Sequence, residues 1–113
     1  MVARLDESGI AQRLDELELF IAWKDLAWIV AYKKDCFTVD DIRLVFSDGK
    51  SQIELSESAQ SIPEANVVLA ANVSLAVPDW YERLMVSPAF EATPTIVYRP
   101  QAAIGVETRE STS

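Results

Sequence analysis

The sequence predicts an α+β domain in which an antiparallel β-meander of four strands and a C-terminal strand are covered on one face by one longer and one short helix. Short alternating or β-rich runs fill the first half of the chain, two capped helix starts follow, and another β-rich run comes last. Strands joined by short turns pair as neighbours, and the helices must then cover the apolar face of the sheet. We place this single domain at residues 1–100 of the 113-residue chain.

The N-terminal segment and the first two predicted strands differ in the types and spacing of their side chains. Residues 1–17 have loosely periodic apolar positions interrupted by Gly9, and they predict an arm or a short helix. Residues 18–23 and 26–32 are rich in aromatic and β-branched side chains, which favour strands, and a short polar turn separates them.

The next two strands form a predicted hairpin. Residues 38–46 alternate between apolar and polar side chains, with a clean period of two from Ile42 onward, and residues 51–55 alternate again. The intervening Asp48-Gly49 is a strong hairpin signal because both residue types tolerate positive φ. We therefore expect a two-residue turn at Asp48-Gly49.

Capping residues mark the helices. Ser61, followed three residues later by Glu64, reads as a capping box that begins the longer helix. Asp79 begins the short helix at residues 80–86 in the same way. Residues 95–99 are β-rich and predict the last strand, whereas the small and polar residues 101–113 predict a disordered C-terminal tail.

The amino-acid composition limits the classes of partner and the cellular compartment that we expect for this protein. Lys and Arg total 10 and Asp and Glu total 18, which gives a formal net charge of −8. Such a chain repels phosphate backbones and anionic lipid, so nucleic acid and membrane are excluded as predicted partners and a basic protein is favoured. The single cysteine forbids an intrachain disulfide, the N-terminus lacks the apolar stretch of a signal peptide, and the densest apolar run has seven residues. These features predict a cytoplasmic protein.

The residue inventory argues against an enzyme. The chain has no histidine, which excludes Ser-His-Asp and Cys-His mechanisms and histidine-ligated metals. Cys36 lacks a neighbouring base and is expected to be a small strand-end residue. The spacing of Asp35, Asp40 and Asp41 matches no calcium loop and is typical of turns. The sequence also lacks a glycine-rich phosphate-binding loop. We therefore predict no catalytic residues, no bound metal and no cofactor.

Two groups of residues remain as candidate binding sites. Trp80, Tyr81 and Phe90 come from one proline-punctuated segment and are a candidate interface, because aromatic residues dominate binding energy at interfaces. Tyr32 and Lys33, at the end of a strand, are a candidate site for an anionic small molecule. In each case the alternative is structural: the aromatic residues fill the core, and the lysine extends into water.

Two blocks of sequence resemble a known family. Residues 23–40 contain Trp-x-Asp-Leu followed by Ile-x-Ala-Tyr-Lys-x-Asp-x-Phe-Thr, and residues 78–95 contain a closing Trp-Tyr and Pro-Ala-Phe-Glu. These blocks are similar to a family of small uncharacterised bacterial proteins, a resemblance that implies no activity. The entry into the strand meander also resembles bacterial pleckstrin-homology-like domains, which is a likeness of fold that carries no site.

Two functional hypotheses follow. The first is a non-enzymatic protein-interaction domain, with a homodimer formed through the terminal strand as one version. The second is a small-molecule binding domain with its pocket near Tyr32 and Lys33.

Overall fold

The computed structural model describes residues 2–36, 39–86 and 94–100 of the chain. Its elements follow one another in the order β1 (Ala3–Leu5), β2 (Gly9–Leu14), β3 (Leu17–Ala22), the 3-10 turn η1 (Trp23–Asp25), β4 (Trp28–Cys36), β5 (Val39–Ser47), β6 (Gln52–Ser56), α1 (Ile62–Asn72), α2 (Trp80–Val86) and β7 (Thr95–Tyr98).

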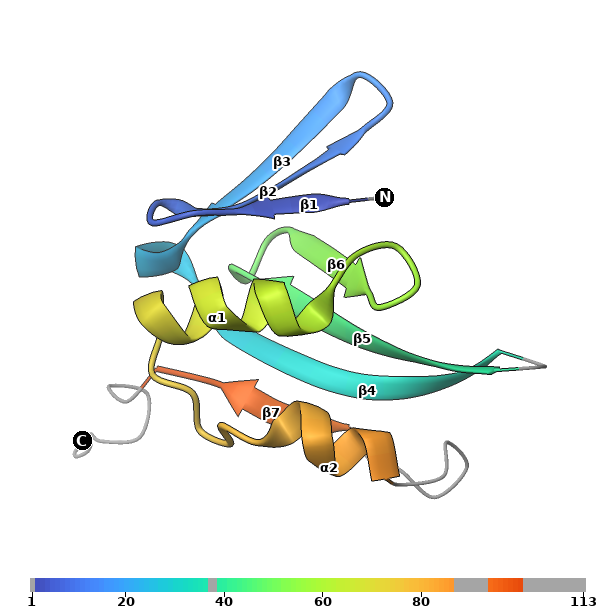
Figure 1. Cartoon of the computed structure of the whole chain (residues 1–113). Coiled ribbons are helices and arrows are strands. Elements are labelled where there is room, and N and C mark those ends of the chain that lie inside the picture. The colour runs from blue at the N-terminus through green and yellow to red at the C-terminus, as the bar shows by residue number, and fades with distance from the viewer. Residues whose placement is uncertain (1, 37–38, 87–93, 101–113) are drawn as a thin grey trace.

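The strands form two antiparallel sheets (Figure 1). One has the order β1-β2-β3 and the other has the order β6-β5-β4-β7. The α+β class and the strand-rich meander, which is β4-β5-β6, are therefore confirmed. The predicted first strand of the meander, residues 18–23, instead belongs to the other sheet, because η1 turns the chain between β3 and β4.

The prediction of an arm or short helix for residues 1–17 is wrong, since β1 and β2 occupy this segment. The Asp6 carboxylate shapes the turn between them by accepting hydrogen bonds from the N–H groups of Ser8 and Gly9, at 2.8 and 3.3 Å. At Gly9, where φ is 157°, a Cβ atom would lie 2.2 Å from the carbonyl oxygen of Ile21. Gly9 is thus required by the close approach of β3, and not by the end of a helix.

The β5–β6 hairpin forms with Gly49 at positive φ, 93°, but its turn is shifted by one residue. Asp48 does not have positive φ, and its N–H donates to the Ser51 carbonyl at 3.3 Å, so Gly49 and Lys50 are the central residues. The Asp48 carboxylate accepts hydrogen bonds from the N–H groups of Lys50 and Ser51, at 2.8 and 2.7 Å. Glycine at the first central position is the residue preferred in a type II′ turn.

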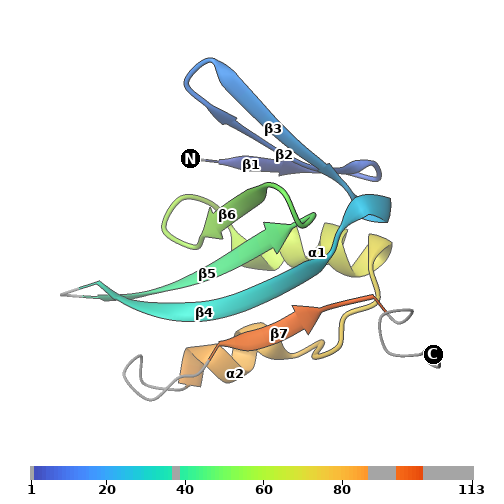
Figure 2. The same ribbon diagram turned by 180° about the vertical axis from the view of Figure 1, so that it is seen from behind.

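Both predicted helix starts are correct. The Ser61 hydroxyl accepts a hydrogen bond from the Glu64 N–H at 3.3 Å, which satisfies one free amide of α1. α2 begins at Trp80 as predicted, but among the described residues no hydrogen bond from the Glu82 N–H to Asp79 is found, and the Asp79 carboxylate pairs with Arg83 at 2.9 Å. Both helices lie on one face of the β4-β5 sheet, as the two opposite views show (Figures 1 and 2).

The hydrophobic core lies between the helices and the covered face of the sheet. Its largest fully buried side chains are Trp80, Phe46, Ile10, Ile21, Ile29, Ile42, Leu44, Ile53, Leu55, Ile62, Leu69 and Val97. Both sheets and both helices contribute to this cluster, so the described residues pack around one core.

Candidate functional site

The uncovered face of the meander carries the most distinctive polar chemistry among the described residues. Along β5, Ile42 and Leu44 are buried under the helices, and the intervening Arg43 and Val45 therefore point to the opposite face. Tyr32 is the register partner of Arg43 on β4. Alternation along adjacent strands thus brings an aromatic ring and a guanidinium side by side.

This face forms the floor of a groove of about 700 Å³. The β2–β3 hairpin stands away from the β4-β5-β6 sheet, and β2 contributes one wall (Figure 2). The lining side chains that matter for its chemistry are Gln12, Leu14, Tyr32, Arg43, Val45 and Glu54. We call this feature the groove.

A hydrogen-bonded network covers the floor of the groove. The Tyr32 hydroxyl donates to the Glu54 carboxylate, and Arg43 Nη1 lies 3.6 Å from Glu54 Oε2. Arg43 also donates through Nε to Asp41 Oδ2 at 2.8 Å. The guanidinium is therefore shared between two carboxylates, which fixes its position on this face.

Asp41 lies two residues before Arg43 on β5 and anchors this network. Its side chain is buried, since the residue is only 3% exposed. The hydroxyl of Ser56 donates to Oδ2 at 2.7 Å, and the N–H of Ser58 donates to Oδ1 at 3.2 Å. Burial by itself would raise the pKa of Asp41, but the hydrogen bonds from Ser56, Arg43 and Ser58 outweigh it and lower the pKa below the usual value. Asp41 is therefore charged at neutral pH.

The network beneath the groove is acidic. Arg43 contributes one positive charge to it, and Glu54 and Asp41 contribute two negative charges, which leaves −1, while the exposed Lys34 lies opposite Asp41 on the same face. Burial and the hydrogen bond to Glu54 raise the pKa of Tyr32, so the phenol is neutral. The hydrogen bond to Asp41 raises the pKa of Arg43, whose charge is permanent in any case.

Gln12 connects the hairpin to the meander. Its Nε2 donates to the backbone carbonyl of Glu54 at 3.0 Å, and the side chain is 6% exposed. A buried side-chain amide that bonds to a strand backbone fixes the wall of the groove relative to its floor. The groove is thus held open by packed elements on both sides.

The two residues of the sequence-predicted ligand site are separated. Tyr32 lies in the groove, whereas Lys33 is on the other face of β4, where its Nζ donates to the Met85 carbonyl of α2 at 3.2 Å. The cation next to Tyr32 is Arg43. Sequence reasoning missed Arg43, Glu54 and the role of Asp41, although the period of two along residues 38–46 was a signal that could have placed Arg43 on the face opposite Ile42 and Leu44.

Trp80, one of the three residues of the predicted aromatic interface, is not exposed on the surface. Its side chain is fully buried in the core, and its Nε1 donates to Asn66 Oδ1 at 3.2 Å. Tyr81 is half-buried, packs edge-on to Trp80 at a ring distance of 5.6 Å, and donates to Glu57 at 3.0 Å. Trp80 is a core residue because α2 presents it directly to the sheet. Phe90 lies outside the described residues.

Comparisons with known proteins give no match for this chain. The chain matches no family model, no curated protein and no solved structure. Within the described ranges, no three histidine, cysteine or acidic side chains are grouped to hold a metal ion. No helix in the same part of the chain has the length and apolar character needed to cross a bilayer.

Proposed function

We propose that this chain is a non-enzymatic protein-interaction domain that binds an extended, basic segment of a partner protein in the groove. The observation that carries the proposal is the pairing of Arg43 with two carboxylates, Asp41 at 2.8 Å and Glu54 at 3.6 Å. Because Arg43, the one cation among the described residues that line the groove, is already paired with carboxylates, the remaining negative charge of the network attracts a positively charged group. The net charge of −8 on the whole chain adds long-range attraction for the same partner.

The shape of the groove supports an extended segment. Its floor consists of adjacent strands that present Tyr32, Arg43, Val45 and Glu54 on one face, and Leu14 lies on the wall. An extended segment whose basic side chains all point toward the floor, at every second residue, would meet these groups. The floor is rigid, because packed strands hold its side chains, and little entropy would be lost on binding.

The protonation of the floor supports a binding role rather than catalysis. The pKa of Asp41 is lowered and the pKa of Tyr32 is raised, so both move away from neutrality. A general acid or base works best with a pKa near the operating pH. The acidic charge also argues against nucleic acid and anionic membranes as partners, and the single cysteine is in keeping with a cytoplasmic location.

A direct test uses a labelled peptide in which lysine alternates with valine, and a control peptide with glutamate in place of lysine. Fluorescence polarisation should detect binding of the lysine peptide only, with an affinity that falls as salt is added. Glu54→Gln should weaken binding by up to about fivefold, the effect of one exposed ion pair. Glu82→Gln is the matched control, because Glu82 is exposed on α2. Equal binding of both peptides, or no binding, would contradict the proposal.

A small-molecule site in the same groove is the second candidate. Its volume of about 700 Å³ lies within the range of ligand pockets, roughly 300–1,000 Å³. A cationic ligand fits the floor better than the anion expected from Tyr32 and Lys33, because Lys33 is on the other face. Thermal-shift titrations with arginine amide and with phosphate separate these cases. Stabilisation by phosphate alone would favour the anion.

A further inference from the structure

Two of the four sheet edges are capped by glutamine side chains. The Gln60 amide accepts from the N–H of Ala3 at 2.7 Å and donates to its carbonyl at 3.0 Å, which covers the outer edge of β1. Gln12 donates to the Glu54 carbonyl at 3.0 Å on the outer edge of β6. A glutamine amide offers one donor and one acceptor, so it substitutes for part of a neighbouring strand. These edges are protected against pairing with another chain.

The edge of β7 is also covered in part, and β3 is the exception. The Val97 carbonyl accepts from the N–H of Ala76, in the segment between the helices, at 2.7 Å. By contrast, no hydrogen bond among the residues that the structure describes reaches the outer edge of β3, which spans six residues. Its side chains Leu17 and Phe20 are 60% and 51% exposed. An open strand edge with exposed apolar side chains is a template for another strand.

We propose that β3 pairs antiparallel with β3 of a second copy of this chain, around a two-fold axis at Phe20, so that two three-stranded sheets become one six-stranded sheet. A two-fold axis normal to a continuous sheet places a residue opposite its own copy. With Phe20 at the axis, the two exposed rings form a cross-strand aromatic pair. Glu18 then lies opposite Ala22 of the second copy, so that no carboxylate faces another along the strand.

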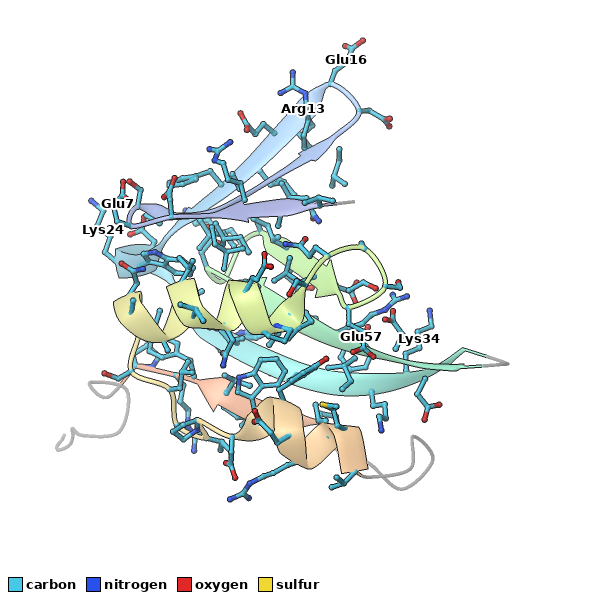
Figure 3. All side chains as sticks on the ribbon, viewed as in Figure 1. Glu7, Arg13, Glu16, Lys24, Lys34 and Glu57 are labelled. Atoms are coloured by element: carbon cyan, nitrogen blue, oxygen red, sulfur yellow. The ribbon has the colours of Figure 1, made fainter. Side chains whose placement is uncertain are left out.

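Charged residues that flank β3 favour this register: Glu16 in the turn before the strand and Lys24 in η1 after it. Figure 3 shows Glu16 at the tip of the hairpin and Lys24 at its base, four residues on either side of Phe20. Antiparallel pairing about Phe20 brings Glu16 of one copy to the level of Lys24 of the other, and the symmetry repeats this contact. An axis at Glu18 would instead place two carboxylates directly opposite each other, which is destabilising. The complementarity is local, since both copies carry the same net charge of −8, and it is this pair of contacts that points to a second copy as the occupant.

The primary test is the mass of the full-length chain in solution, measured by sedimentation equilibrium up to millimolar concentration. A monomer–dimer equilibrium is expected. A chain that stays monomeric overturns the proposal. The open edge of β3 would then be a binding site for a strand of a different protein. Phe20→Lys should give a folded monomer, because it places a charge at the centre of the pair. Val67→Lys, at a side chain of α1 that is 70% exposed, is the matched control and should still dimerise.

A charge-reversal cycle tests the register without touching an apolar side chain. Glu16→Lys and Lys24→Glu should each raise the dimer dissociation constant, by roughly tenfold, since each disrupts two symmetric contacts. The double variant should restore the wild-type value, because the charges are then exchanged. Additive weakening in the double variant, or a dimer unaffected by Phe20→Lys, would place the interface elsewhere. This outcome is independent of peptide binding in the groove.

Discussion

The two faces of the β4-β5-β6 meander are built from alternate residues of the same strands, yet they differ in chemistry. On the face under the helices, Leu44, Phe46 and Ile53 are fully buried and apolar. On the other face, Tyr32 and Arg43 belong to a half-buried polar network beneath the groove. A single sequence with a period of two can therefore encode a surface that provides stability and a surface available for binding. Substitutions at neighbouring residues should separate the two properties.

The largest effect is expected for Trp80→Ala on the covered face. Removal of a fully buried indole leaves a cavity between α2 and the sheet, and should cost about 3–5 kcal/mol of unfolding free energy. Urea denaturation followed by circular dichroism measures this loss. If the variant were as stable as the wild type, Trp80 would not be a core residue. Sedimentation of the folded variant should give the same oligomeric state as the wild type.

Leu44 and Val45 provide the sharpest comparison because they are adjacent on β5. Leu44→Ala should cost about 2–5 kcal/mol, since its side chain is fully buried, and leave peptide affinity unchanged in the folded protein. Val45→Ala should cost less stability, because the side chain is half-buried, and should weaken binding in the groove. Equal stability losses at the two positions would mean that both faces are core.

Asp41 should make the stability of the open face depend on pH. Its folded pKa is lowered, so the stability that it contributes is present above the ordinary aspartate pKa of about 3.9 and is lost as the pH falls through the folded value. Asp41→Asn should cost about 1–3 kcal/mol at neutral pH, and the difference from wild type should shrink in acid. Chemical denaturation at a series of pH values measures this change.

Asp79→Asn is the control for that experiment. Asp79 pairs with Arg83 at 2.9 Å, but both side chains are more than half exposed, and such pairs contribute little. The interpretation of Asp41 would fail if both variants lost the same stability, or if the loss at Asp41 were constant from neutral to acid pH.

The smallest effect is expected for the two tyrosine hydroxyls. Tyr32→Phe removes a hydrogen bond to Glu54, and Tyr81→Phe removes one to Glu57, so each should cost about 0.5–1.5 kcal/mol. Only Tyr32→Phe should alter peptide binding, because only Tyr32 lines the groove. Isothermal titration of both variants distinguishes them, and an equal loss of affinity would refute the assignment of the groove.

Local signals in the sequence determined the elements that depend on short-range chemistry. Ser61 predicts the start of α1 because a capping side chain acts within one turn, and its hydroxyl accepts from the Glu64 N–H. The start of α2 after Asp79 is also as predicted, although the Asp79 carboxylate pairs with Arg83. Gly49 predicts the β5–β6 hairpin because positive φ is a property of one residue, although the bonding of Asp48 set the central pair of the turn. The alternation along β5 correctly assigned Arg43 to the side opposite Leu44.

Only the tertiary structure decided which of these surfaces is covered. Gly9 resembles a helix breaker in the sequence, but the approach of Ile21 from β3 makes it a strand residue. Trp80 has the composition of an interface residue, and α2 buries it because the sheet lies beneath that helix. Tyr32, Arg43 and Glu54 are distant in sequence and meet only through strand register. Periodicity shows which residues share a face, but burial and contact depend on long-range packing, which no short window of sequence contains.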